Sequence, residues 1–120
     1  MKQVSWRIMK NEKGSVIIIV AAAMVLLLGI AALVVDVGVL FYNKVALSNA
    51  ADAAALAGVQ ELPHDHTKAR ETAEAYAVSN GVETGQVLAE VLPDGRSIRV
   101  ATSRVVPLGF ARILGFSSTK

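Results

Sequence analysis

The feature that most constrains this chain is an unbroken apolar run over residues 16–35, VIIIVAAAMVLLLGIAALVV. At a rise of about 1.5 Å per residue, a helix of this length spans about 30 Å, the thickness of the hydrocarbon core of a bilayer. A buried helix of a soluble protein would normally show a polar stripe over such a length, and this run has none. Because apolar residues continue past Asp36, we predict a single membrane-spanning helix over residues 16–42.

A cleaved signal peptide is the main alternative for this segment. The apolar core of a signal peptide is about 7–15 residues long and is followed closely by a cleavage site with small residues. Here the apolar run is longer, and the Ala-x-Ala matches at residues 50–57 lie too far downstream. The pattern therefore favours a membrane anchor that is retained.

Positive charge is concentrated on the N-terminal side of the run. Residues 1–15 carry a net charge of +3, whereas residues 16–120 carry −1. Basic residues beside a span mark its cytoplasmic side. We therefore expect a single-pass protein of the inner (cytoplasmic) membrane, with a cytoplasmic basic segment at residues 1–15 and an extracytoplasmic C-terminal part. The overall net charge of +2 is too small to suggest a nucleic-acid partner.

The helix is expected to continue beyond the membrane. The first proline of the chain is Pro63, and residues 43–62, NKVALSNAADAAALAGVQEL, are rich in strong helix formers. We predict one continuous helix from about Ser15 to Glu61, in which residues 43–62 form an extracytoplasmic helical extension.

Small and short polar residues recur every seven positions on one face of this helix, with further alanines beside them. Small residues let helix backbones approach closely, which is the main route to helix association in lipid. The pattern predicts a helix-packing face and possible self-association; the competing interpretation is that alanine is simply abundant. The residues of this packing face are Gly29, Ala32, Asp36, Asn43, Ala46, Ala50, Ala53 and Ala57, with Ala22 at the inner end.

Residues 33–62 contain an apolar segment, then Asp36-Val37-Gly38, the aromatic Tyr42, the basic Lys44 and the block AADAAALAG at residues 50–58. This segment resembles the N-terminal module of the TadG-like proteins, which belong to bacterial tight-adherence (Tad/Flp) pilus systems. The family pattern is an apolar helix, then Asp-x-Gly, an aromatic residue, a basic residue and an alanine-rich block ending in Leu-Ala-Gly. Ser48 departs from the pattern, because the family commonly has Gln there. The matching residues are Asp36, Gly38, Tyr42, Lys44, Leu47 and the block Ala50–Gly58, which contains Asp52.

The resemblance implies a non-enzymatic, membrane-anchored component of pilus assembly, with other pilus-assembly or pilin-like membrane proteins as partners. It also places Gly38 and Asp52 among the residues expected to act in assembly. An alternative is a pilin-like minor subunit that is cleaved after Gly14 and enters a filament. Prepilins usually carry Glu at the fifth position after the cut, where this chain has Ile19, so we expect residues 1–15 to be retained.

Residues 63–120 have an ordinary soluble composition. Alternating apolar residues on both sides of an Asp-Gly turn at residues 93–96 predict a hairpin. Helices are predicted over Thr67–Ser79 and Pro107–Leu114. The predicted fold class is therefore α+β: one long transmembrane helix extending outward, followed by a small helix–hairpin–helix domain. So small a core is marginal, and the sequence leaves open whether the domain is incomplete or relies on the sheet edge of a partner.

Particular contacts are expected within this domain. Arg70 and Glu74 have the spacing of an ion pair on one helix. The side chains expected to face the core are Ala69, Ala73, Tyr76 and Ala77 in the first helix, and Phe110, Ile113 and Leu114 in the last.

The chemistry that the sequence offers is sparse. Cysteine is absent, which excludes a disulfide and a thiol nucleophile. His64 and His66 supply two ligands where a zinc site needs three or four, so we interpret them as part of a solvated linker. No phosphate-binding or catalytic motif is present. We predict no enzymatic activity, no cofactor and no small-molecule substrate; a membrane-anchored envelope enzyme is the alternative from another class.

Asp36 is the most singular polar residue, because it closes the apolar run. Two interpretations are open. The carboxylate could end the membrane span by hydration, or it could pair across a helix interface and sense assembly.

Overall fold

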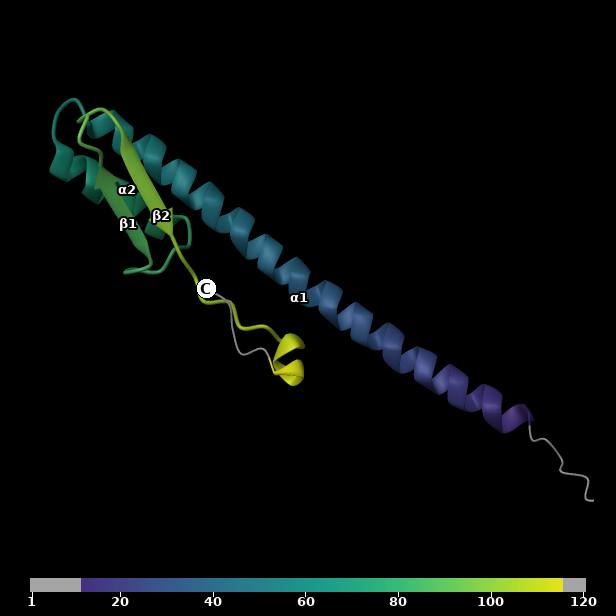
Figure 1. Ribbon diagram of the computed structural model, residues 1–120. Coiled ribbons are helices and arrows are strands. Elements are labelled where there is room, and N and C mark those ends of the chain that lie inside the picture. Colours follow the sequence, from purple (N-terminus) through teal and green to yellow (C-terminus); the bar gives the residue numbers. More distant parts are fainter. Residues whose placement is uncertain (1–11, 116–120) are drawn as a thin grey trace, which may run out of the picture.

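The computed structural model describes residues 12–115. Its longest element is α1 (Glu12–Glu61), a continuous helix of 50 residues that ends two residues before Pro63. At about 1.5 Å per residue, such a helix is about 75 Å long. The predicted continuous helix is confirmed, and the second helix and the hairpin lie along its C-terminal part (Figure 1).

Helix α2 (His66–Ser79) folds back on α1 after a short turn. Asp65 caps its N-terminus: one carboxylate oxygen accepts the backbone N–H groups of Thr67, at 2.7 Å, and of Lys68, at 3.2 Å. The bonds from Lys68 and Thr67 hold the pKa of Asp65 below its usual value. The predicted helix over Thr67–Ser79 is therefore confirmed, with one residue more at its start.

Two expected contacts of α2 are wrong. Its inner face consists of Ala69, Ala73 and Ala77, whereas Tyr76 is 52% exposed, because it lies to one side of the alanine row. Within the described residues, the ion pair joins Lys68 Nζ to Glu61 Oε2 of α1, at 3.1 Å, and not Arg70 to Glu74. Contact with α1, and not spacing along α2, selects the pair.

The predicted hairpin is confirmed. Strands β1 (Val87–Val91) and β2 (Ile98–Thr102) pair antiparallel, with Ala89 opposite Val100. In the connecting turn, the Asp94 carboxylate accepts the backbone N–H groups of Arg96 and Ser97 and the hydroxyl of Ser97. Gly95 has φ +63°, a left-handed conformation that glycine adopts readily.

The hairpin lies across the two helices, with β2 nearer α1 and β1 nearer α2 (Figure 1). The helices thus give the two strands the cover that an isolated hairpin lacks. The core between them is built from small side chains, which brings the backbones close together. Its buried members are Ala50, Ala54, Ala73, Ala77, Val82 and Ala89, flanked by Leu47, Val87, Ile98 and Val100.

The end of the described chain departs from the prediction. The helix expected over Pro107–Leu114 is only a 3-10 helix, η1 (Ala111–Leu114), closed by Gly115 with φ +94°. The expected packing of Phe110 and Ile113 onto the hairpin is wrong: they are 48% and 80% exposed and lie beside α1. The inner face of the hairpin is already covered by α1 and α2, so residues 103–115 run along α1 instead (Figure 1). We call residues 103–115 the C-terminal strap.

Candidate packing face of the long helix

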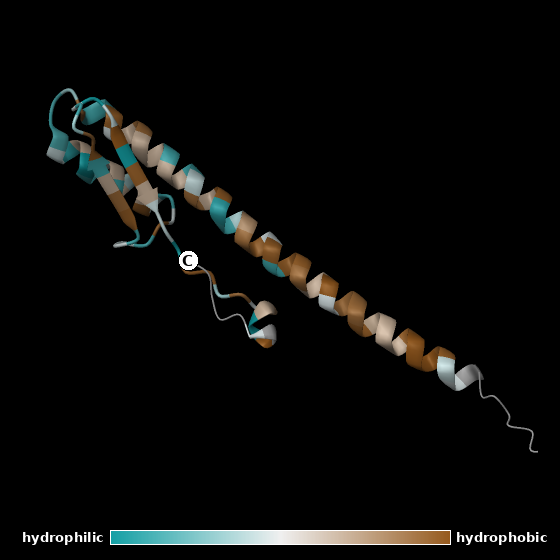
Figure 2. Cartoon of the chain, in the orientation of Figure 1, coloured by the Kyte–Doolittle hydropathy of each residue, from teal (hydrophilic) through white to brown (hydrophobic). Residues whose placement is uncertain are grey.

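The N-terminal half of α1 presents an apolar surface on nearly all sides (Figure 2). Large side chains of the run over residues 16–35 are exposed; Ile18 and Val25, for example, are 71% and 72% exposed. By length and composition α1 can cross a membrane. An apolar surface of this extent is typical of a helix whose environment is lipid or other membrane helices.

The predicted packing face of α1 is covered over most of its length by the chain itself. The upper part, around Ala50, lies against α2 and the hairpin, and the lower part lies against the C-terminal strap. Contacts of this face with a second chain stay a prediction. The structure buries or half-buries Ala32, Asp36, Asn43, Ala46, Ala50, Ala53 and Ala57, and it leaves exposed Gly29, Gly38 and Asp52.

Asp36 is the most closely bound residue of this face. It is only 5% exposed, and its carboxylate accepts the backbone N–H groups of three successive residues of the strap. Gly109 N lies 3.2 Å from Oδ1, Phe110 N lies 3.0 Å from Oδ2, and Ala111 N also donates to Oδ2. Hydrogen bonds to a carboxylate are stronger than those between neutral groups. The interpretation of Asp36 as a hydrated end of the span is therefore wrong: the carboxylate is dehydrated and bound by the chain itself.

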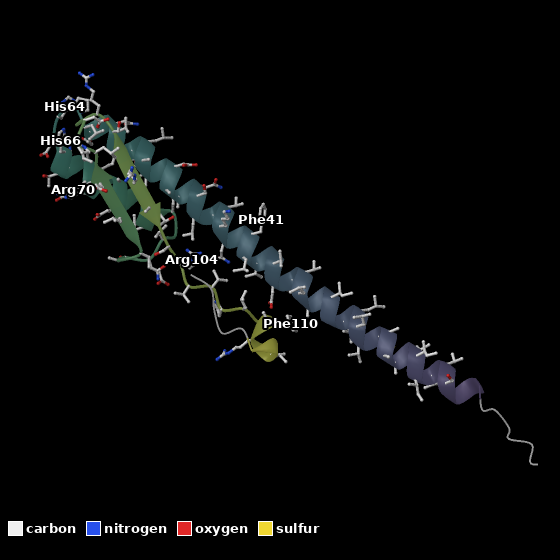
Figure 3. All side chains as sticks on the ribbon, viewed as in Figure 1. Phe41, His64, His66, Arg70, Arg104 and Phe110 are labelled. Carbon is white, nitrogen blue, oxygen red and sulfur yellow. The ribbon has the colours of Figure 1, made fainter. Side chains whose placement is uncertain are left out.

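A second set of polar contacts holds the strap about two helical turns above Asp36. Arg104 Nη1 donates to Asn43 Oδ1 at 3.1 Å, and Nη2 donates to the backbone oxygen of Gly81. Just before the strap, the Thr102 hydroxyl donates to the backbone oxygen of Leu47 at 3.1 Å. Figure 3 shows Arg104 and Phe110 on the strap side of α1, with Phe41 on the other side. The strap is thus fixed to α1 at two levels.

Below Asp36 the strap and α1 enclose a shallow apolar cavity of about 300 Å³. One wall is made by Phe110, Ala111 and Ile113, and the other by residues 28–33 of α1, including Gly29 and Ala32. A Cβ atom added at Gly29 would meet nothing within 4 Å. The lower end of the packing face is therefore open in the single chain.

Residues 14–61 match the family model described as "Putative Flp pilus-assembly TadE/G-like". We call these residues the TadE/G-like module, after the family to which they are similar. No curated protein and no solved structure matches the chain significantly. The match supports involvement in pilus assembly, in agreement with the resemblance noted in the sequence.

The TadE/G-like module coincides with α1 from Gly14 onward, so the module is one helix. Helix α2, the hairpin and the strap lie outside it. Sequence reasoning singled out Asp36 but missed its partners at residues 109–111, because backbone amides leave no signature in a sequence. It also missed Arg104, for which the only signal is a basic residue two positions after a predicted strand.

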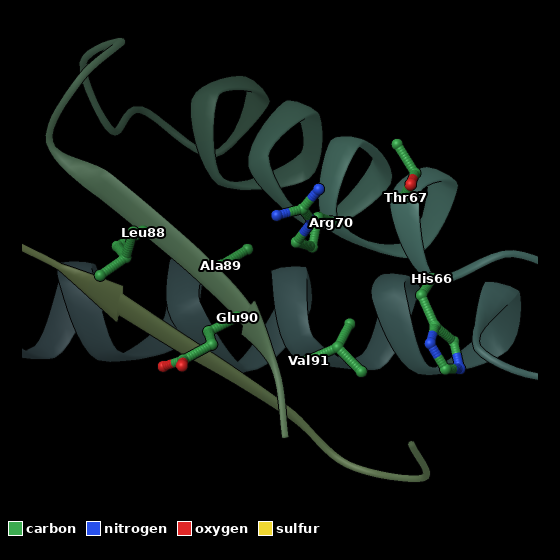
Figure 4. Close-up of a pocket in the computed structure, with 7 residues that line it drawn as sticks. All are labelled: His66, Thr67, Arg70, Leu88, Ala89, Glu90 and Val91. Carbon is green, nitrogen blue, oxygen red and sulfur yellow. The ribbon is translucent and has the colours of Figure 1, made fainter. Parts of the chain in front are cut away.

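A second hollow, of about 470 Å³, lies between α2 and β1 (Figure 4). His66, Thr67 and Arg70 line it from α2, and residues 88–91 line it from β1. Within the described part of the chain, no group of three or more His, Cys, Asp or Glu side chains comes together in the manner of a metal site. The polar side chains that line the hollow are His66, Thr67 and Arg70 of α2 and the acid Glu90 of β1.

Proposed function

We propose that this chain is a membrane-anchored, non-enzymatic component of Flp/Tad-type pilus assembly. The observation that carries the proposal is that the TadE/G-like match falls on one helix whose N-terminal half is apolar and exposed. A protein with this build can hold an extramembrane unit at a fixed distance from the bilayer. Its role would then be to position or contact other proteins of the pilus machinery.

The proposed orientation places the N-terminus in the cytoplasm and α2 with the hairpin outside it, with α1 crossing the inner membrane once. Support comes from the charge difference across the span: a net +3 on residues 1–15, against three acids and one base, Asp36, Asp52, Glu61 and Lys44, between residues 36 and 62. The positive-inside rule orients spans by the basic residues of such short flanks.

The proposed partners are other pilus-assembly or pilin-like membrane proteins, or a second copy of this chain. Because α2, the hairpin and the strap already cover the packing face from Ala32 to Ala57, its free part is the lower end around Gly29. We propose that Gly29 and Ala22 make contacts between membrane helices there.

Removal of the chain from a bacterium that assembles Flp-type pili tests this function. Surface pili should be lost or strongly reduced, and the full chain should restore them. A chain in which residues 1–42 are replaced by a cleavable signal peptide should not restore the pili. Normal piliation without the chain would contradict the proposal.

The minor-subunit alternative differs in its processing. We expect the chain to stay in the membrane fraction at its whole mass of 12.6 kDa. Recovery from sheared filaments of a species that begins at Ser15 would favour cleavage after Gly14 and the filament role.

A further inference from the structure

The C-terminal strap lies beside the membrane-spanning part of α1. Phe110, Ala111 and Ile113 stand against residues 28–33, which belong to the apolar run over residues 16–35. If α1 crosses the bilayer with this run, the lower end of the strap is at the depth of the bilayer and not in the water above it. The inference below thus rests on the membrane anchoring proposed above.

The exposed side chains of the strap suit that depth. Residues 105–115, VVPLGFARILG, contain a single charged residue, Arg112. Val106 and Leu108 are buried, whereas Phe110 and Ile113 turn large apolar surfaces outward. In Figure 2 this part of the strap shows brown stretches with paler and teal stretches between them. A side chain such as Ile113, 80% exposed, is well accommodated by acyl chains and poorly by water.

Several backbone N–H groups of the strap are also hydrogen-bonded within the protein. In lipid, each backbone polar group needs a partner within the protein. Asp36 accepts the N–H groups of Gly109, Phe110 and Ala111. The next bonds are internal to the strap: Ile113 N donates to Phe110 O at 3.0 Å, and Gly115 N donates to Arg112 O.

We propose that residues 107–115 enter the leaflet on the C-terminal side of α1, that Phe110 and Ile113 contact lipid acyl chains, and that Asp36 is the residue that holds this segment there. The occupant of the exposed strap surface is therefore the lipid of the bilayer. Arg112, which is exposed, can reach the phosphate layer with its guanidinium while its stem stays among apolar groups.

The absence of cysteine allows a direct test with single-cysteine variants carrying a spin label. The full chain is reconstituted in nanodiscs of phosphatidylethanolamine and phosphatidylglycerol. Collision of the label with oxygen, which concentrates in lipid, is compared with collision with a water-soluble nickel chelate. Ile113→Cys is the test position, Leu27→Cys reports the middle of the span, and Glu83→Cys reports an exposed loop.

We expect the label at Ile113 to be accessible to oxygen and several-fold less accessible to nickel than the label at Glu83. Nickel accessibility equal to that at Glu83 would place the strap in water and overturn the inference. Low accessibility to both reagents would mean that protein covers the strap, which also overturns it. If the label at Leu27 is itself accessible to nickel, residues 16–35 do not span the membrane, and the proposed function is contradicted as well. If nickel reaches the label at Ile113 but not the label at Leu27, only the inference about the strap is contradicted.

The role of Asp36 is tested in the same experiment. Asp36→Ala should raise nickel accessibility at Ile113 several-fold, toward the value at Glu83, because three amides lose their acceptor. Asp52→Ala is the matched control, since Asp52 is an exposed acid on the same helix, and it should leave the label unchanged. An unchanged label in Asp36→Ala would contradict the assignment. A label at Glu90 on β1 checks that the hairpin stays folded in every variant.

Discussion

At Gly58, α1 approaches α2 so closely that a side chain has no room. A Cβ atom there would lie 2.8 Å from Ile98 Cδ1, 2.9 Å from the backbone oxygen of Ala69 and 3.1 Å from Ala73 Cβ. The Ile98 side chain could move, but the Ala69 carbonyl belongs to helix backbone and cannot yield cheaply. Gly58, the last residue of the alanine-rich block, therefore sets the distance between the two helices.

We expect Gly58→Leu to destabilise the packing of α1 against α2 and the hairpin. Overpacking of this kind typically costs about 1–3 kcal/mol or more. Thermal denaturation of the detergent-solubilised chain, followed by circular dichroism, measures the effect. Gly38→Ala is the matched control, because a Cβ at Gly38 meets nothing within 4 Å, and alanine there should stabilise the helix slightly. Equal melting temperatures for the two variants would contradict a close approach of α1 and α2 at Gly58.

At the scale of elements, α2 depends on its cap. Backbone N–H groups of Lys68 and Thr67 donate to Asp65 and lower its pKa. Because the pKa is lower in the folded than in the unfolded chain, the stabilisation is fully present above the unfolded value, about 3.9, and is lost as the pH falls through the folded value. Asp94, whose pKa is lowered chiefly by the backbone N–H of Arg96, acts in the same direction in the hairpin turn.

The melting temperature should therefore fall as the pH is lowered from about 5 to about 3. Asp65→Ala should melt at a lower temperature at neutral pH and should lose less on acidification, because one of the responsible carboxylates is gone. The difference between variant and parent should shrink at the acid end. A constant difference across this range would contradict the cap as the source.

Helix α1 carries the prediction on association. Its packing face is open at Gly29, so Gly29→Leu would add a side chain where a second helix is expected. Overpacking of about 1–3 kcal/mol weakens association by roughly ten- to a hundredfold. Disulfide crosslinking from a cysteine placed at Ala22 measures it, and Ile18→Leu, which keeps the volume on another face, should have little effect. If crosslinking is unchanged in Gly29→Leu, this face does not mediate association, and its small residues only reflect how common alanine is in α1.

Elements that are determined by neighbouring residues can be predicted from the sequence, whereas elements that depend on contacts between distant residues cannot. The long helix follows from the apolar run and the absence of proline before Pro63, and the hairpin follows from alternation around Asp94 and Gly95. The strap could not be predicted, because Asp36 and Phe110 are 74 positions apart and meet through backbone groups. A local pattern at residues 107–114 indicated a helix, but the bonds to Asp36 prevail over it and leave only its last turn.

At the scale of the whole molecule, one helix serves both as the candidate membrane span and as part of the core that it forms with α2 and the hairpin. Within the described residues, no large side chain is fully buried, and alanines from α1 fill the space beneath the hairpin. We therefore expect residues 63–120 alone to show no cooperative unfolding transition, and residues 43–120 to recover one. Calorimetry or circular dichroism of the two fragments decides this; a cooperative transition in the shorter fragment would make it an independent domain.

We propose that α1 is a single-pass anchor that holds α2 and the hairpin outside the cytoplasm. The most direct measurement is a pair of fusions after Lys120, one to alkaline phosphatase, which is active only outside the cytoplasm, and one to a fluorescent protein that folds only inside it. We expect an active phosphatase and a dark fluorescent fusion, both in the membrane fraction. A fluorescent fusion with inactive phosphatase would contradict it.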